Sequence, residues 1–207
     1  MDYLKWRGDL TFSQDAFNEV DNLLLSFVAY VNLEGLSVGA GEEQVTLEEL
    51  SRRFFVLHSE EELAADKSFT RLAPYIVKMM AQSNRYRTSI ISNYVNMVNP
   101  QLELQFSAVQ LDLSDGSKNF CFRGTDDNIV AWKEDFNIGL GEVPAQKLAS
   151  EYLNRFGVGT SPIRVSGHSK GGNLAVYAAA ACKIEVQERI TDVSVSYTHL
   201  TLPTKLE

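Results

Sequence analysis

Cysteine and histidine are scarce in this chain of 207 residues, which has two cysteines and three histidines. Cys121 and Cys182 provide neither a disulfide framework nor the spacing of metal ligands, so we expect both to be small buried residues. The sequence also has no P-loop, no G-x-G-x-x-G and no pair of histidines spaced along a helix. We therefore expect neither a metal nor a nucleotide cofactor.

Basic residues and long apolar runs are lacking too. The chain has 19 Lys and Arg against 27 Asp and Glu, a formal net charge of -8. A nucleic-acid surface needs clustered Lys and Arg, so we expect no nucleic-acid partner. The apolar run Leu23 to Val31 is too short to span a bilayer, and the N-terminus lacks the apolar core of a signal peptide. We predict a cytoplasmic protein without a transmembrane segment.

The clearest motif is G-H-S-K-G, which is centred on Ser169. Residues 163–166 are apolar and predict a short strand, whereas the Ala-rich residues 170–182 predict a helix. Ser169 is therefore expected at a strand-to-helix turn, in a strained backbone conformation that costs roughly 1–3 kcal/mol. Gly167 and Gly171 leave the room that such a close backbone approach needs.

A serine in this position projects its hydroxyl above the sheet, next to the positive end of a helix. This arrangement is the nucleophile elbow of α/β-hydrolases. We predict that Ser169 is a catalytic nucleophile and that the backbone N–H of Lys170 is one oxyanion donor. G-x-S-x-G alone also fits an ordinary βα turn, so the prediction depends on the flanking strand and helix.

The second oxyanion donor is expected at F-R-G-T, where a predicted strand ends in Gly124 and Thr125. Alone, this segment also fits a simple β-turn. Followed by a short predicted helix with Trp132 and Asp135, and later by the serine turn, it resembles the fungal-type (class 3) lipases. The resemblance implies an oxyanion-hole role for Thr125 and a structural role for Asp135.

The segments L-K-W-R-G-D-L, F-N-E-V-D and G-H-S-K-G-G-N-L-A are still more similar to a bacterial branch of these hydrolases, the Mbeg-like proteins. The branch has no settled substrate. The resemblance implies a serine-dependent hydrolase of a small acyl ester or lipid, and the alternative is a non-catalytic interaction or regulatory protein on a hydrolase scaffold. Lys170 replaces the Leu that is usual in lipases, and a charged rim there argues against long-chain interfacial substrates.

A serine nucleophile needs a general base, usually histidine, and none of the three histidines is a good candidate. We expect His168 to point away from the Ser169 hydroxyl and to pack in the interior. His58 precedes the serine, whereas the base follows it in hydrolases. We expect Asp192 to be a turn residue rather than the triad acid.

His199 lies in residues 195–207, a segment that resembles a translated sequencing adapter. We interpret this segment as a non-native tail. The triad Asp and His are then expected beyond Ser194, and this chain is expected to have weak activity or none.

The remaining pattern predicts a single incomplete domain over residues 1–194. Residues 1–86 have helical periodicity, with helices over 13–30 and 71–82 and two starts at Thr46 and Ser59. Residues 87–194 hold the strands, including a hairpin at Asp115-Gly116 and a bulge where the apolar set slips after Ala108. The expected fold is α/β: an α/β-hydrolase-type sheet, mostly parallel with one antiparallel hairpin, flanked by helices and by an N-terminal helical layer, with the C-terminal part missing.

Overall fold

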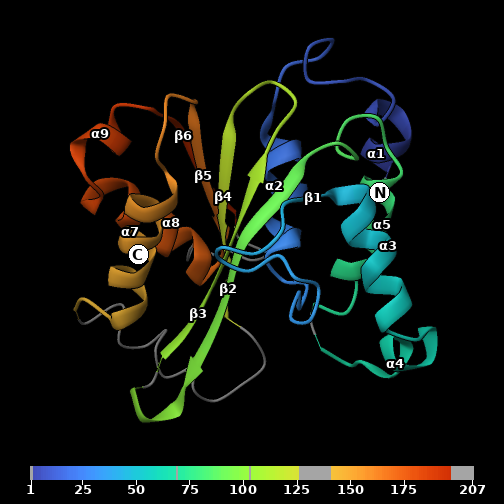
Figure 1. The fold of residues 1–207 in the computed structure, drawn as a ribbon, viewed down its shortest axis with the longest axis horizontal. Helices are drawn as coiled ribbons and strands as arrows, with labels where there is room; N and C mark the ends of the chain where they lie inside the picture. Colours follow the sequence, from blue (N-terminus) through green and yellow to red (C-terminus); the bar gives the residue numbers. More distant parts are fainter. Residues whose placement is uncertain (1, 69, 103, 126–140, 197–207) are drawn as a thin grey trace, which may run out of the picture.

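The computed structural model describes residues 2–68, 70–102, 104–125 and 141–196, and within them one six-stranded sheet lies between two groups of helices (Figure 1). The strands are β1 (Val45–Thr46), β2 (Ile90–Asn99), β3 (Leu104–Asp112), β4 (Lys118–Phe122), β5 (Ile163–His168) and β6 (Ile190–Ser196). Their order in the sheet follows their order in the chain.

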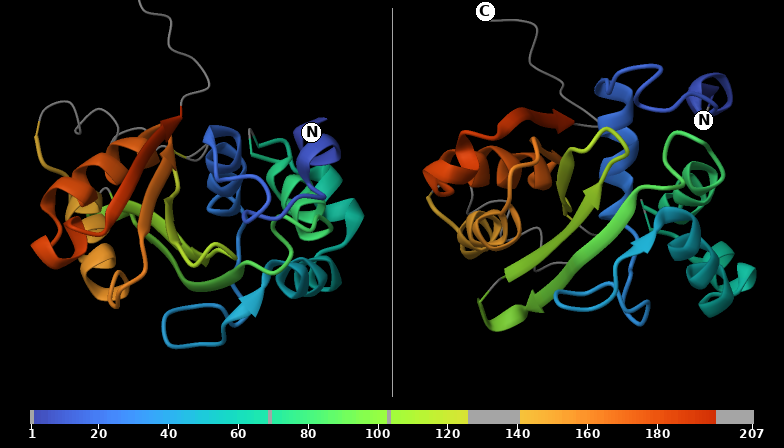
Figure 2. Two further views of the ribbon diagram at one scale, coloured as in Figure 1. Left: turned by 90° about the horizontal axis from the view of Figure 1, so that it is seen from above. Right: turned by 45° about the horizontal axis from the view of Figure 1, so that its top comes forward.

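The helices of the first half cover one face of the sheet, and those of the second half cover the other (Figures 1 and 2). The first group is α1 (Asp2–Arg7), α2 (Glu19–Val28), α3 (Leu47–Leu57), α4 (Glu60–Ala65) and α5 (Ala73–Ala81). The second group is α7 (Pro144–Phe156), α8 (Lys170–Ala181) and α9 (Ile184–Gln187), and a 3-10 turn, η1 (Pro100–Leu102), joins β2 to β3. No helix in the described part of the chain has the length and apolarity needed to cross a membrane.

The sheet is largely antiparallel, so the prediction of a mostly parallel sheet is wrong. β1 to β4 pair antiparallel, and only β4–β5 and β5–β6 are parallel. A parallel pair needs a crossover of about a dozen residues or more. The short turn η1 and the hairpin at Asp115-Gly116, where Gly116 has φ 84°, force antiparallel pairing. Within the described residues from β2 onward, the helix-containing connections lie on either side of β5, and they join the parallel pairs. β1 and β2 pair antiparallel although α3, α4 and α5 lie between them.

Local capping signals set several helix starts. The Thr46 hydroxyl accepts a hydrogen bond from the Glu49 N–H at 3.2 Å, and Ser59 forms a reciprocal capping box with Glu62. Both predicted starts are confirmed. The expected helix over 13–30 is shorter, because the Asn18 side chain caps the chain and starts α2 at Glu19. The N-terminal part also supplies a strand that was not predicted, since β1 extends the sheet beside β2.

The sheet has a hydrophobic core on each face, and successive side chains of a strand point into one core and then the other. On β3, Phe106 and Ala108 belong to the core beside α7 and α8, whereas Val109 and Leu111 belong to the core beside α2 and α3. After Ala108 the apolar residues therefore change from even to odd positions because β3 is buried on both faces. The bulge predicted there is wrong.

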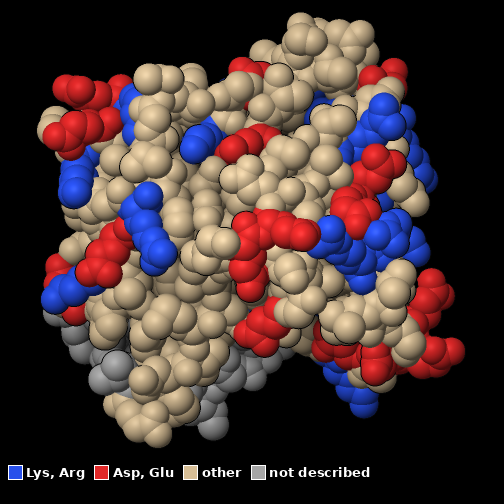
Figure 3. Space-filling model, in the orientation of Figure 1, with Lys and Arg blue, Asp and Glu red and all other residues tan. Residues whose placement is uncertain are grey.

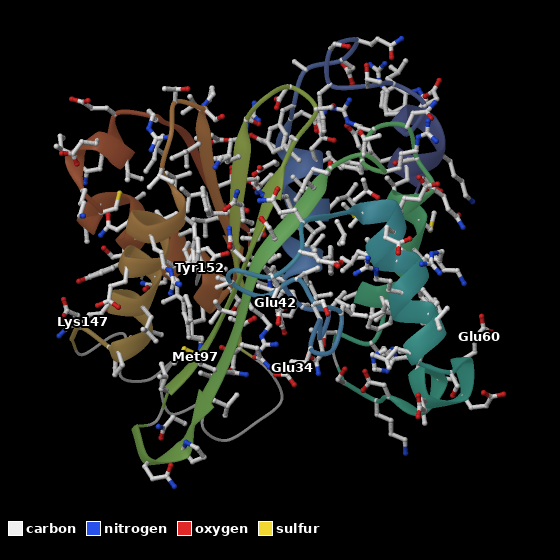
Figure 4. The ribbon with its side chains drawn as sticks, viewed as in Figure 1. Glu34, Glu42, Glu60, Met97, Lys147 and Tyr152 are labelled. Atoms are coloured by element: carbon white, nitrogen blue, oxygen red, sulfur yellow. The ribbon has the colours of Figure 1, made fainter. Side chains whose placement is uncertain are left out.

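The irregularity lies instead in the partner strand β2, between Ser92 and Val95. Asn93 has φ 54° and turns its backbone out of the ladder. Its carbonyl accepts a hydrogen bond from the Tyr152 hydroxyl at 2.8 Å. Figure 4 shows Tyr152 between α7 and the sheet, so this side chain ties the helix to the distorted strand.

Charged side chains on the surface are interspersed rather than gathered by sign over the face drawn in Figure 3. Glu49 accepts hydrogen bonds from Arg52 at 2.6 Å and Arg53 at 2.8 Å, and Arg53 also pairs with Glu43 at 2.8 Å. The hydrogen bonds from Arg52 and Arg53 lower the pKa of the Glu49 carboxyl to about 2. Being exposed, such pairs contribute little to stability.

A buried ion pair joins α2 to the segment after α5. Asp21 and Arg85 are both fully buried, and the guanidinium donates two hydrogen bonds to the carboxylate at 2.6 and 2.5 Å. The Tyr86 hydroxyl donates a third. Burial alone would lower the pKa of Arg85, but the hydrogen bonds and charge of Asp21 outweigh it and raise the pKa.

Replacing Asp21 by Asn should lower the free energy of unfolding by about 3–5 kcal/mol, because the buried guanidinium loses its counter-charge. The matched control is Asp15→Asn: Asp15 is partly exposed and approaches Arg85 only to 4.0 Å, so the loss should be about 1 kcal/mol or less. Urea unfolding followed by circular dichroism measures both. Equal losses in the two variants would contradict the assignment of Asp21–Arg85 as the main link.

Candidate functional site

Ser169 forms the whole turn between β5 and α8, because the strand ends at His168 and the helix begins at Lys170. Its backbone has φ 57° and ψ -124°, a combination that costs a non-glycine residue of order 1–3 kcal/mol. The Ser169 N–H donates to the Ser196 carbonyl at 2.8 Å, and its carbonyl accepts from the Gly172 N–H at 2.9 Å. The side chain is half-buried at the edge of the sheet. The predicted strand, turn and helix are confirmed.

The two glycines of the motif allow direct backbone contact. A Cβ built on Gly167 would lie 2.1 Å from the Gly171 carbonyl oxygen, and one built on Gly171 would lie 2.1 Å from the Phe122 carbonyl oxygen. These neighbours are backbone atoms, which cannot rotate away. The start of α8 therefore rests directly on the ends of β4 and β5.

The segment after β4 lies against the serine turn. β4 and β5 are parallel, with Phe122 opposite Gly167, so both strands end at the same edge of the sheet. A Cβ built on Gly124 would lie 2.4 Å from the His168 carbonyl oxygen and 3.3 Å from Ser169 Cβ. The next residue, Thr125, is half-buried. The fold thus brings both halves of the sequence-predicted site to one place.

Lys170 does not form a charged rim, and that prediction is wrong. The residue is 5% exposed, and its ammonium group donates to the Gln105 carbonyl on β3 at 3.0 Å. The side chain runs inward beneath the turn, while its backbone occupies the first position of α8. The positive end of the helix dipole is therefore next to the Ser169 hydroxyl.

His168 packs in the interior, as predicted. It lies beside Tyr30, a residue that the sequence did not single out. The Tyr30 hydroxyl and His168 Nδ1 are 2.9 Å apart, and burial lowers the pKa of the imidazole. The same hydroxyl would lie 2.3 Å from a Cβ on Gly124, so it contacts both the residue before Ser169 and the segment after β4. Nothing in the local sequence around Tyr30, just after α2, signals a partner so far along the chain.

The other histidines and acids do not complete a triad within the described residues. His58 ends α3, where its ring stacks on Phe54 with centroids 4.4 Å apart. Asp192 is exposed within β6 rather than in a turn, which corrects that expectation. His199, Trp132 and Asp135 lie outside the described residues, and no histidine inside them hydrogen-bonds to Ser169.

The cysteines are both free and buried, as predicted. Burial raises the pKa of the Cys121 thiol to about 12, so it is not a nucleophile at neutral pH. Across the described ranges there is no group of three or more His, Cys, Asp or Glu side chains that could hold a metal ion.

A strained serine between a parallel strand and a helix, with glycines on both sides, is the architecture of α/β-hydrolase-related proteins. A family model described as Mbeg1-like matches residues 80–199, more than half of the sequence, and the chain belongs to this α/β-hydrolase-related family. The matched range includes Thr125, Ser169 and Lys170 but not Tyr30. Comparisons with curated proteins and with solved structures gave no match.

Gly171→Ala should lower the free energy of unfolding by about 1–3 kcal/mol, because the added methyl group collides with the Phe122 carbonyl. Gly141→Ala is the control, since a Cβ at Gly141 meets no atom within 4 Å. Urea unfolding should show little change for the control. If Gly171→Ala left the free energy of unfolding unchanged, α8 would not rest directly on β4.

Proposed function

We propose that the protein is a serine-dependent acyl-ester hydrolase that acts through an acyl-Ser169 intermediate. The observation that carries the proposal is the strained, half-buried serine at the start of α8, with Gly124 against it and Thr125 next in the chain. Membership of an α/β-hydrolase-related family supports it. The substrate class is a small acyl ester or lipid.

In the proposed reaction, the Ser169 oxygen attacks the ester carbonyl carbon and its proton passes to a general base. The negative charge on the carbonyl oxygen is stabilised by the Lys170 N–H and by Thr125, near the positive end of α8. The intermediate then expels the alcohol, which takes up a proton, and leaves the acyl group on Ser169. Water attacks the acyl-enzyme, releases the acid and restores the serine.

Neither His58 nor His168 is assigned as the general base, because the former stacks on Phe54 and the latter engages Tyr30. An oxyanion hole and substrate binding alone still accelerate hydrolysis by roughly 10³–10⁴-fold over water. The alternative, a non-catalytic interaction protein on the same scaffold, is therefore distinguished by whether Ser169 reacts, not by a high rate.

Ser169→Ala should abolish labelling by a fluorophosphonate and lower hydrolysis of p-nitrophenyl butyrate to the residual rate that the oxyanion hole and substrate binding alone support. Mass spectrometry of the labelled wild type should place the phosphonyl group on Ser169. Ser161→Ala, a half-buried serine that precedes β5, should leave both signals unchanged. Absence of labelling at Ser169 in the wild type would favour the non-catalytic alternative.

Thr125→Val should lower kcat by about 10²-fold, the typical cost of one oxyanion donor, because it removes the hydroxyl while keeping the branched shape. Thr125→Ser retains a hydroxyl and should keep kcat within a few-fold. Steady-state kinetics with p-nitrophenyl butyrate measures both. If Val and Ser variants behave alike, the hydroxyl of Thr125 is not the donor.

A further inference from the structure

An apolar cavity of about 210 Å³ lies between the N-terminal helices and the serine turn. Its walls come from three parts of the chain. These are the end of α2 with the residues after it, the start of α5 with the residues before it, and the end of β5. The lining includes Phe27, Tyr30, Leu72, Ala73, Ile76 and His168. Apart from the Tyr30 hydroxyl, the Thr70 hydroxyl and the imidazole, these side chains are hydrocarbon or aromatic.

The cavity adjoins the proposed nucleophile through two of its own lining residues. His168 immediately precedes Ser169 in the chain. Tyr30 reaches from α2 to His168 Nδ1 at 2.9 Å and contacts Gly124, the residue before Thr125. The polar groups of Tyr30 and His168 are thus engaged with each other at the elbow. The rest of the lining is an apolar surface that begins one residue before Ser169.

We propose that this cavity binds the acyl chain of the ester, an inference that rests on the proposed function of Ser169. A cavity of about 150 Å³ lined by apolar side chains holds a benzene molecule, so 210 Å³ takes roughly eight carbon atoms. The substrate class is therefore a medium-chain acyl ester. Each methylene that enters should raise kcat/KM about three- to fourfold, until the cavity is full.

A larger cavity of about 590 Å³ between α2 and β6 is not the acyl site. Its lining combines apolar side chains with the carboxylates of Glu19 and Asp192 and with polar side chains, which are those of Asn22, Ser194 and Ser196. An alkyl chain there would desolvate charged groups without offering them a partner, which is unfavourable. Among the described residues that line the smaller cavity, none carries a carboxylate or ammonium group.

The test is the chain-length profile of kcat/KM for p-nitrophenyl acetate, butyrate, octanoate and palmitate, with Ile76→Trp as the variant that fills the cavity. Wild type should prefer octanoate. Ile76→Trp should lower kcat/KM for octanoate at least tenfold and leave acetate within twofold. Val56→Trp, a substitution at an exposed position on α3, is the matched control and should leave the whole profile unchanged. An unchanged profile in Ile76→Trp would overturn the inference.

A binding measurement separates this inference from the proposed function. Ligand-observed NMR should show 1-octanol bound to Ser169→Ala protein, with at least tenfold weaker binding when Ile76→Trp is added. Octanol binding of this kind without turnover of any ester overturns the hydrolase function but supports an alkyl-chain site. Ester turnover without octanol binding, or with octanol binding that Ile76→Trp does not weaken, overturns the acyl site and leaves the function standing.

Discussion

The site depends on a contact between backbone atoms that only glycine permits. Gly171 rests on the Phe122 carbonyl, and Gly167 rests on the carbonyl of Gly171, so α8 lies directly on the ends of two parallel strands. Because no side chain separates these elements, neither can shift without the other. The strained backbone of Ser169 is therefore maintained by packing on both sides, which is how an unfavourable φ and ψ persist in a folded protein.

The N-terminal helices form part of the site rather than a separate layer in front of it. α2 packs on β4 and β5, and the chain just after it supplies Tyr30, which contacts His168 and Gly124. The buried pair of Asp21 and Arg85 fixes α2 to the segment after α5. The ion pair thus holds in place the helix that supplies Phe27 to the wall of the apolar cavity, and Asp21 lies before the residues that match the family.

Local chemistry was predictable from the sequence, and long-range arrangement was less so. The caps at Thr46 and Ser59 and the glycines around Ser169 act over a few residues, so their patterns are visible in the chain. The antiparallel hairpin between β3 and β4 was predicted from Asp115-Gly116 and is confirmed. The sheet as a whole was expected to be mostly parallel because of the hydrolase resemblance, which outweighed the short connection between β2 and β3 that requires antiparallel pairing. Tyr30 could not be predicted, because its role arises only when α2 packs beside β5.

The buried position of Lys170 changes the interpretation of the site. Lys170 follows Ser169 directly in the chain. Its ammonium group is buried and donates a hydrogen bond to the Gln105 carbonyl on β3. This hydrogen bond anchors the first residue of α8 to β3, while the backbone of that residue keeps the positive end of the helix next to Ser169. Because the charge lies inside rather than at the rim, it places no ionic group in the path of an alkyl chain. The replacement of the usual lipase leucine by lysine is thus compatible with an apolar acyl group.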